Sequence, residues 1–435
     1  MKISGFDNII SIDSFEYLNR IDNHELCSFS AWMKEDDLDK ALANSDCDIE
    51  FEDDSFKFTG HVMDVSVSRD ISGVFVEVKA VGKTYKSDQE HFSRVFQQED
   101  KTISDILSHM KSMSNIDFQN QDDPTIEDVI FQNNETEWAF SIRLINRYGL
   151  HLFSSESPYI GKYGKDKSEI DNKQLIDYRF TSNSQSSYLF CRTDISLSIG
   201  AQIKYMNNEF YVCAKKYVLD KGKYYFEYEL IQIRTDTEIK KDSVNEYLYA
   251  KVTDNNDPDK KGRLQVNFES ENIEDCMKDS PMWIDRLDFY ANKGFGPVFI
   301  PQIDDIVRIH LFNGDCKIVG CVRSEAYSSP YDDCNFKYLL LDDDIYILFG
   351  GGKITVHYKE EVIALSEDEI TITSGDKSAI HSTKDKVLIQ KDKAAIEITS
   401  DINASGGKFI VEAKGDASIS ATNVNIKGKS GVSIN

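Results

Sequence analysis

The sequence predicts a mainly β protein with a few helices, ending in a needle built from repeated short strands. Polar and apolar residues alternate over short segments along most of the 435 residues, which is typical of strands with one buried and one exposed face. From about residue 350 to residue 435, such segments follow one another with only short turns between them. A chain of this length is expected to hold about three domains of roughly 150 residues each.

Residues 1–153 are the first predicted domain, in which strands are combined with helices. The segments 56–67 and 74–80 alternate as strands do. One helix is expected over residues 87–96. A second is expected over residues 102–113, because its apolar residues recur on one helical face.

A third helix is expected to begin at Asn134 and to end before Gly149. Asn134 is suited to cap the helix, Glu137 is suited to reach back to the cap, and glycine commonly follows a helix end. Charged side chains accompany its apolar stripe, which fits either a packed amphipathic helix or a catalytic Glu/Arg arrangement, with packing the preferred interpretation: Glu135, Glu137, Arg143 and Arg147.

Four further segments are predicted after the first domain. Residues 154–240 are again rich in alternating segments, and their last polar residues, from 234 to 245, are the candidate linker. Residues 246–325 have the pattern of a compact β module. Residues 326–349 are a connector, and residues 350–435 form the needle.

The needle prediction rests on one apolar row per strand. Residues in this row recur every seven or eight positions late in the chain, and they are the predicted needle core: Ile410, Ala417, Ile419, Val424, Ile426, Val432 and Ile434. A repeat this short cannot bury its apolar face alone, so it must stack on neighbours. One row per strand is about enough if three chains each supply one wall. We therefore predict an intertwined trimeric β-helix, or β-prism, with strands across its axis.

Composition excludes several classes of function. The net charge of −25 argues against nucleic acid and anionic membranes as partners. No apolar run approaches the ~20 residues of a membrane span, and the first residues do not resemble a secretory signal, so we expect synthesis in the cytoplasm. The eight cysteines are scattered and are expected to be thiols. No histidine pair has metal-ligand spacing and no catalytic motif occurs, so neither a cofactor, a metal nor a catalytic residue is predicted.

Three passages of the chain resemble one protein family. The first is residues 131–153, the second is residues 92–97 with 103–106, and the third is the module at 246–325. The first passage carries these matching residues: Gln132, Asn134, Glu135, Thr136, Ala139, Phe140, Arg143, Leu144, Tyr148, Gly149, Leu150 and Phe153. The third carries, in order, Gly262, Trp283, Gly294, Gly296, Pro301, Gly314 and Asp315. Together these passages resemble the baseplate hub and spike of contractile phage tails and their type VI secretion counterparts, the valine–glycine-repeat (VgrG) proteins.

The resemblance implies an architecture and a structural role. It implies two β-barrel-like hub domains, at 1–153 and 154–240, and an oligonucleotide-binding-type (OB) barrel at 246–325. It implies a homotrimeric spike that pierces a target cell envelope, carries a tip protein or effectors, and leaves the cell when the machine contracts. The implied partners are a hexameric inner-tube protein, baseplate proteins and a conical PAAR-like tip protein docking at Ile434 and Asn435. Nucleic acid is not expected, because the OB module is rich in acidic residues.

Two other functions were weighed against the spike. An envelope-degrading enzyme on a β-fibre would need a catalytic domain, and only about residues 324–349 separate the barrel from the needle. A receptor-binding tail fibre or adhesin would be expected to end in a globular head, and none follows Asn435. The spike is therefore preferred, and no enzymatic activity is expected.

Overall fold

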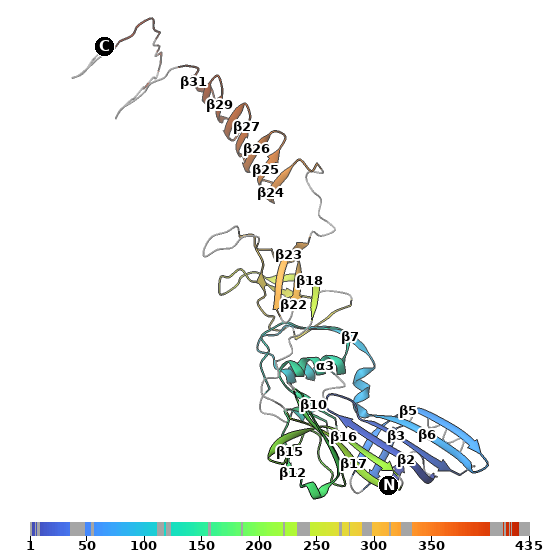
Figure 1. Ribbon diagram of the computed structural model, residues 1–435. Coiled ribbons are helices and arrows are strands. Elements are labelled where there is room, and N and C mark those ends of the chain that lie inside the picture. The colour runs from blue at the N-terminus through green and yellow to red at the C-terminus, as the bar shows by residue number, and fades with distance from the viewer. Residues whose placement is uncertain are drawn as a thin grey trace. The chain divides into compact units, whose positions relative to one another are not determined.

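A computed structural model of the chain is mainly β and falls into two compact units, residues 1–325 and 326–435. It describes residues 2–4, 6, 9–34, 48–53, 56–110, 117–118, 123–154, 158–183, 186–220, 222–232, 244–268, 272–277, 279–288, 298–312, 315–322, 333–400, 412, 415–416, 418 and 420–425. Each unit is drawn as ribbons in Figure 1. Among the described helices, none is both long and apolar enough to cross a membrane.

A sheet of twelve strands dominates the first unit. Ten of its strands lie in the order β1-β4-β5-β6-β3-β2-β16-β17-β14-β13, and β15 pairs with both β16 and β12. The strands from the beginning of the chain are β1 (Lys2–Ser4), β2 (Ile9–Arg20), β3 (Leu26–Met33), β4 (Asp48–Asp53), β5 (Phe56–Asp70) and β6 (Gly73–Gly82). The later strands are β12 (Lys167–Glu169), β13 (Leu175–Ser182), β14 (Ser187–Thr193), β15 (Gln202–Tyr205), β16 (Asn208–Asp220) and β17 (Lys223–Gln232).

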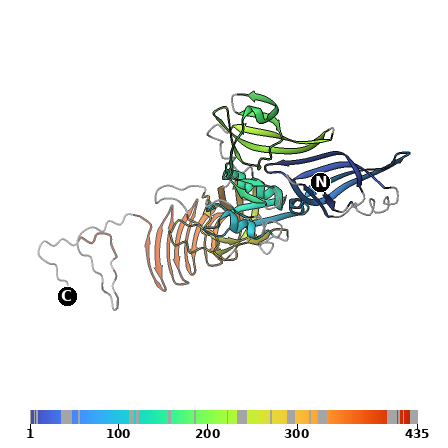
Figure 2. The same ribbon diagram turned by 90° about the horizontal axis from the view of Figure 1, so that it is seen from below.

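Both halves of this sheet are curled (Figure 2), and aromatic side chains contact one another within each half. In the first half, Phe15 of β2 meets Phe51 of β4 edge to face, with ring centroids 5.2 Å apart. In the second half, the half-exposed Phe180 of β13 meets the buried Phe210 of β16 edge to face, with ring centroids 6.5 Å apart. Such edge-to-face contacts are the preferred geometry of buried rings. The curled halves therefore share one apolar core.

The two halves are joined by direct strand pairing. β2 and β16 run antiparallel, with Ala214 opposite Arg20 and Leu219 opposite Phe15. This pairing crosses position 153/154, where the sequence analysis divided two hub domains. The division into 1–153 and 154–240 stays a prediction, and the structure adds that the sheet is continuous across it.

The segment between the two halves of the sheet along the chain combines helices with short strands, and we call it the helical layer. It contains the 3-10 helix η2 (Lys83–Asp88), β7 (His91–Phe96), α2 (Ile103–Ser108), β8 (Asp117–Phe118), β9 (Ile130–Thr136), α3 (Glu137–Arg147), β10 (His151–Phe153) and β11 (Tyr159–Gly161). A short 3-10 helix, η3 (Asn172–Gln174), precedes β13. The apolar faces of α2 and α3 form a second buried core. Gly149 follows α3 with φ +67°, a left-handed conformation that glycine adopts without steric cost.

Two local predictions in this layer are wrong. The helix expected over residues 87–96 is replaced by η2 and by strand β7, because β7 pairs with β9 on one side and β20 (Glu274–Cys276) on the other. The cap of α3 is Thr136 instead of Asn134, because the Thr136 hydroxyl accepts from the Ala139 amide at 3.1 Å. Asn134 lies within β9 with φ +49°.

Residues 245–322 form a small closed barrel, the barrel module. Its strands are β18 (Asn245–Asp254), β19 (Gln265–Asn267), β21 (Asp285–Arg286), β22 (Ile306–Phe312) and β23 (Asp315–Val322), in the order β19-β18-β22-β23-β21. A bridge between Leu264 and Ile284 connects the two edges of this sheet. The inward residues of β18 and β22 form its core, together with hub residues Val95, Val129 and Phe131.

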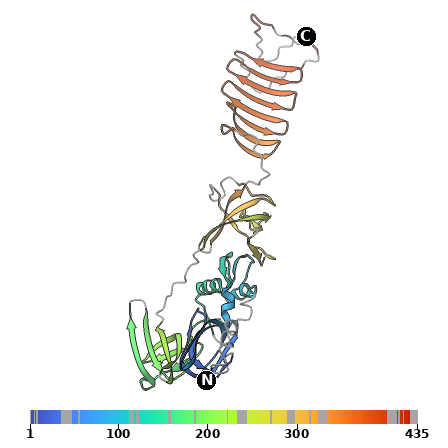
Figure 3. The same ribbon diagram turned by 90° about the vertical axis from the view of Figure 1, so that its right-hand side faces the viewer.

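The described strands of the second unit form one antiparallel meander, the C-terminal sheet. Figure 3 shows these strands stacked one above another. Its strands are β24 (Lys337–Asp342), β25 (Ile345–Gly350), β26 (Lys353–Tyr358), β27 (Glu361–Ser366), β28 (Glu369–Ser374), β29 (Ser378–Thr383), β30 (Val387–Lys391) and β31 (Ala394–Ile398). Strands β24 and β25 lie largely within residues 326–349, which the sequence analysis assigned to a connector. The sheet therefore begins earlier than predicted.

The cap of α3 provides a test of this description. Replacing Thr136 with Ala removes the acceptor of the Ala139 amide and the hydroxyl that donates to Asp88 at 2.5 Å. Loss of such a cap costs about 1 kcal/mol, so we expect the amides of α3 to exchange with solvent roughly fivefold faster. Thr136→Ser keeps the hydroxyl and is the control. Equal exchange in the Ala and Ser variants would contradict this assignment of the cap.

Candidate functional site

The C-terminal sheet carries an unbroken ladder of apolar side chains on one face. Residues directly opposite each other on neighbouring strands form this ladder: Leu339, Ile347, Val356, Ile363, Ile372, Ile380, Ile389 and Ile396. Several of its members, from Val356 to Ile396, are between 38% and 60% exposed in the single chain. Side chains on one face of a sheet contact their cross-strand neighbours, so the ladder forms a continuous apolar stripe.

A second apolar row runs beside this ladder on the same face. Phe349, Ile354, Leu365 and Ile370 lie opposite one another on β25 to β28 and are each at least 40% exposed. The opposite face carries polar residues such as Thr371 and Thr373 on β28. A soluble sheet that is covered by nothing does not normally expose apolar rows of this length. This face is therefore the strongest candidate for an assembly surface.

Tight turns fix the register that aligns the ladder. Gly351 and Gly352 both have positive φ, +61° and +73°, between β25 and β26. Two such residues in sequence match the hairpin turn whose twist suits antiparallel strands. Because a slip of one residue would turn every side chain to the other face, the turns determine which face is apolar.

The predicted needle core and tip lie largely beyond the part of the chain that the structure describes. Val424 is described and is exposed, without an assigned strand. The other predicted residues lie outside the described residues: Ile410, Ala417, Ile419, Ile426, Val432, Ile434 and Asn435. The apolar ladder of residues 339–396 was not singled out from the sequence, although alternating strands were predicted from about residue 350 onward; the ladder residues on β24 and β25 lie in the segment assigned to a connector.

Four of the residues predicted to shape the barrel module lie within the described part of the chain. Gly262 has φ +74°, and Pro301 is buried with its carbonyl accepting from Asn255 Nδ2 at 3.0 Å. Trp283 is half-buried, and Asp315 lies opposite Phe312 at the β22–β23 hairpin, with its carboxylate 3.3 Å from Lys317 Nζ. Gly294, Gly296 and Gly314 lie outside the described residues.

The buried carboxylate of Asp257 holds the loop between β18 and β19 in place, and we call this set of contacts the Asp257 clamp. Asp257 accepts hydrogen bonds from the amides of Asp259 at 3.0 Å and Lys261 at 2.8 Å. The Arg263 guanidinium lies 2.7 Å from the same carboxylate. These hydrogen bonds favour the charged form and hold the pKa of Asp257 well below its usual range. Sequence reasoning counted Asp257 among the surface acids and missed this clamp.

The barrel module is joined to the helical layer by strand pairing and buried polar contacts. Strand β20 pairs in parallel with β7, so that Glu274 lies opposite Arg94 and Asp275 opposite Val95. Arg94 contacts Glu274 at 3.1 Å and Glu137 at 2.8 Å. Gln97 is fully buried and donates to both oxygens of Asp275, at 2.9 and 2.7 Å. Charged hydrogen bonds of this kind tie the two parts in a fixed register.

Lys101 is a fully buried cation at the same junction. Its ammonium donates to the carbonyls of Gln98 at 3.2 Å, Ile126 at 3.2 Å and Asp128 at 2.6 Å. It also lies 3.4 Å from the Met282 sulfur of the barrel module. Burial lowers the pKa of Lys101 to about 8, because desolvation disfavours the charged form.

The charged residues of α3 are paired, which favours packing over catalysis. Arg143 contacts both carboxylate oxygens of Glu135, at 3.0 and 2.6 Å, and the carbonyl of Phe131 at 2.8 Å. Arg147 is paired with Asp128, and Glu137 with Arg94. Each of these groups is engaged in an ion pair, so the helix presents no free acid and base facing a common cavity.

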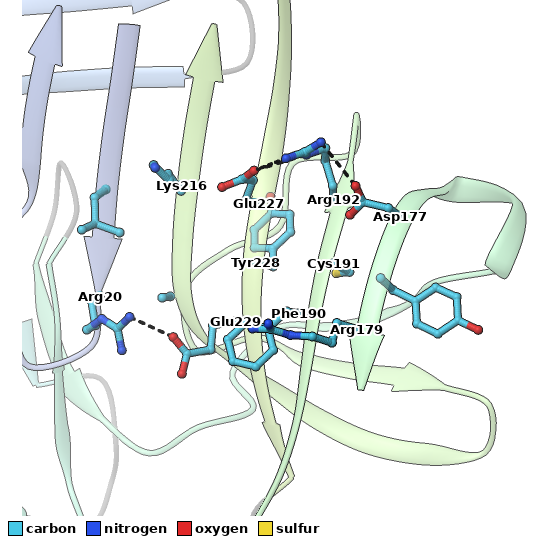
Figure 4. Close-up of a pocket in the computed structure, with 13 residues that line it drawn as sticks. Arg20, Asp177, Arg179, Phe190, Cys191, Arg192, Lys216, Glu227, Tyr228 and Glu229 are labelled. Carbon is cyan, nitrogen blue, oxygen red and sulfur yellow. Dashed lines mark hydrogen bonds and ion pairs between the residues drawn. The ribbon is translucent and has the colours of Figure 1, made fainter. Parts of the chain in front are cut away.

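A shallow concavity of about 500 Å³ lies on the N-terminal sheet, at the junction of its two halves (Figure 4). Two cross-strand rows cover its floor, one running Asp177, Arg192, Glu227, Lys216 and Leu18, the other Arg179, Phe190, Glu229, Ala214 and Arg20. Arg192 contacts Glu227 at 2.7 Å, and Arg20 contacts Glu229 at 2.8 Å. Opposite charges alternate across the strands, which is a common way to stabilise an exposed sheet face.

The concavity has no activated nucleophile. Its one thiol is that of Cys191, and burial raises its pKa to about 12. A thiol at neutral pH is a poor nucleophile, because the reactive form is the thiolate. Among the described residues, no group of three histidine, cysteine or acidic side chains is arranged to hold a metal ion.

The Asp257 clamp predicts an acid dependence of stability. The folded-state pKa is lowered, so the contribution of Asp257 is fully present above its usual pKa near 3.8 and declines as the pH falls below it. Asp257→Asn is expected to lower the urea midpoint at pH 7, and its difference from the wild type is expected to narrow at pH 3. Asp279→Asn is the control, since Asp279 is an exposed acid of the same module, whereas Asp259 also contacts Arg263, at 2.9 Å. A difference that is independent of pH would contradict the clamp.

Lys101 predicts a dependence of the same sign at alkaline pH, because its folded-state pKa is also lowered. Its folded-state pKa of about 8 lies below the usual 10.5, so folding releases a proton between these values and stability rises with pH there. We expect the wild type to gain up to about 3 kcal/mol relative to Lys101→Met between pH 8 and 10.5. Urea unfolding of both proteins across this range measures the difference. A parallel pH profile for the two proteins would contradict the assignment.

Comparisons with known proteins identify the barrel module and the fold. Residues 248–322 match the family described as the type VI secretion system/phage-baseplate injector OB domain. One similar structure is that of the E. coli c3393 protein, described as a type VI secretion component with structural similarity to the T4 phage tail proteins gp27 and gp5. It shares 13% sequence identity with this chain at a TM-score of 0.55, and the alignment covers 74% of this chain and 99% of that chain. No curated protein matched the sequence.

A second similar structure extends the match along more of the chain. The Francisella PdpA-VgrG complex, in its lidded form, contains a chain with 11% identity and a TM-score of 0.53. The alignment covers 88% of this chain and 76% of that chain. The lidless PdpA-VgrG complex gives the same identity and TM-score over 88% of this chain and 94% of that chain. Residues 248–322 are thus similar to the injector OB domain, and the predicted resemblance of the chain to the hub-and-spike proteins of contractile injection systems is confirmed in its fold.

Proposed function

We propose that the chain is the structural spike of a contractile injection machine, a homotrimer whose hub lies at the end of an inner tube and whose C-terminal sheets form a needle. The observation that carries this proposal is the exposed apolar ladder of residues 339–396. Each chain would supply one wall of the needle, with the ladder facing the shared axis. The fold shared with a type VI secretion component and with VgrG supports the same role.

The dimensions of the wall suit a stiff needle. The eight described strands β24 to β31 are stacked side by side. At ~4.8 Å per strand they extend for about 34 Å along the axis. Three walls would cover one another's apolar faces, and interchain contacts along the whole length would oppose bending. Such stiffness is what puncture of a cell envelope requires.

The partners follow from the same proposal. Three copies of a hub with two curled halves would present six similar units to a hexameric inner tube. Baseplate proteins would surround the hub, and a conical tip protein would dock at Ile434 and Asn435. The complex of VgrG with PdpA supports the carriage of further proteins by this kind of spike. The role is mechanical, so we propose that the chain has no enzymatic activity.

An axis-facing charge tests the needle. Ile372→Asp would place a carboxylate in each of three facing walls, where neither water nor a partner compensates its burial. We expect this variant to lose the trimer. Thr371→Asp introduces the same charge on the adjacent residue of the opposite face and is expected to remain trimeric. Light scattering with sedimentation at micromolar concentration measures the assembly state. A folded, monomeric wild type would overturn the proposal, as would an unaffected Ile372→Asp trimer.

A further inference from the structure

The outer face of the barrel module carries a continuous stack of planar side chains, the aromatic ridge. Its members come from two neighbouring strands, Phe312, His310 and Arg308 from β22 and Tyr247 and Tyr249 from β18. The His310 and Tyr247 rings are stacked with centroids 4.4 Å apart, and the Arg308 guanidinium lies 4.3 Å from the Tyr247 centroid. Tyr247, Tyr249 and Phe312 are each about half exposed. Their outer faces are thus available to a partner.

Arg308 gives the ridge an uncompensated positive charge. It is exposed, and its interactions within the described residues are with the rings of Tyr247 and Tyr249. No carboxylate of the described residues lies within ion-pair distance of it. A guanidinium held on a ring face keeps its N–H donors free for a carboxylate. On a chain with a net charge of −25, a free cation beside exposed aromatic rings suits an acidic and apolar partner surface.

The same module carries a second exposed patch, the apolar loop. It bears one negative charge, whereas the aromatic ridge bears a positive charge. It consists of Val298, Phe299, Ile300, Ile303 and Asp304. The four apolar residues are 41–69% exposed, and Asp304 is exposed with no side-chain partner among the described residues. The loop therefore offers a free carboxylate at the end of an apolar surface.

Hydrogen bonds hold the apolar loop in place. Arg286 Nη1 donates to the Phe299 carbonyl at 2.5 Å, and the Gln302 amide donates to Asp305 Oδ2 at 2.8 Å. The Asp304 amide donates to the Val252 carbonyl at 3.0 Å. Because the backbone is fixed, its apolar side chains point outward without a large loss of entropy on binding. Exposed apolar residues on a fixed backbone are typical of an interaction surface.

We propose that the two patches bind each other between neighbouring copies of this chain, with Arg308 of one copy facing Asp304 of the next. This inference rests on the proposed trimer. It assigns the surface through which the OB modules of the three chains contact one another. The contact is heterologous, because two different patches meet, and repetition of a heterologous contact closes into a ring when the rotation allows it.

The placement of the patches suits a ring of three. In a three-membered ring, the directions from one copy to its two neighbours diverge by about 60°, so the two patches must lie on adjacent faces of the module. Asp304 lies in the turn before β22, and Arg308 lies within β22, so the two are at most about 13 Å apart. They are thus near each other on one module, and among the described residues no ion pair joins them.

A weak contact is sufficient at this position. The chain from Val322 to Lys337 can extend to at most about 50 Å, so three joined C-terminal sheets would confine their barrel modules to a small volume. The effective concentration of one module near the next would then be in the millimolar range. At such an effective concentration, a contact that consists of one ion pair and a small apolar area would be formed for a large share of the time.

A charge-exchange experiment on the full chain tests the contact. Arg308→Asp and Asp304→Lys are each expected to lower the urea midpoint of trimer dissociation, measured by light scattering. The double variant Arg308→Asp/Asp304→Lys restores opposite charges and is expected to recover at least half of the summed loss. Asp304 has φ +74°, so Lys is strained there, but this strain is equal in the single and double variants. Asp304→Asn removes the charge alone and is expected to lower the midpoint as well.

The controls separate this proposal from the proposed function. Asp279→Arg makes a charge reversal at another exposed acid of the module and is expected to leave the midpoint unchanged. A trimeric wild type with additive losses in the double variant, or with no loss in the single variants, would overturn the contact and leave the spike intact. A monomeric wild type would overturn the spike and the contact together.

Discussion

The C-terminal sheet pairs its neighbouring strands within one chain but, among the described residues, leaves one face of apolar side chains exposed. A single layer of strands cannot enclose a core, so its stability must come from another layer. The first unit differs, because its three buried clusters lie within residues 1–325. The chain therefore combines a part with its own core and a part for which we propose that assembly supplies the second layer. The proposed trimer, the stiffness of the needle and the ring of barrel modules all follow from that dependence.

The junction between the helical layer and the barrel module shows how these parts are coupled. Here β20 continues the sheet formed by β7 and β9, and the buried side chains of Gln97 and Lys101 fix the register. Covalent connection through a free linker would transmit little force, whereas paired strands resist shear along several hydrogen bonds at once. Each hydrogen bond lost from a buried polar group at such a junction costs free energy, so the observed pairing is favoured over a shifted one.

Alternation and helical spacing in the sequence correctly predicted elements that pack against segments close to them in the chain. Alternation placed a strand at residues 353–358, which is β26, and helical spacing placed Ile103, Ile106 and Leu107 on the buried face of α2. The strand at His91–Phe96 was missed, because its partners lie near residues 130 and 275 and the segment itself has no clear strand pattern. The buried pair of Gln97 and Asp275 was missed for the same reason. The resemblance to hub-and-spike proteins placed the OB domain correctly, because it relied on the order of passages along the whole chain.

The pairing of β2 with β16 has a consequence for synthesis. Arg20 emerges from the ribosome about 190 residues before its partner Ala214. At ~5–20 residues per second, β2 waits roughly 10–40 s with one edge unpaired. Contacts so distant in sequence also slow folding, because a long loop must close before they form. During this interval the nascent chain exposes a strand edge that neighbouring copies could pair with, so the production of this protein in active form would depend on keeping nascent chains apart.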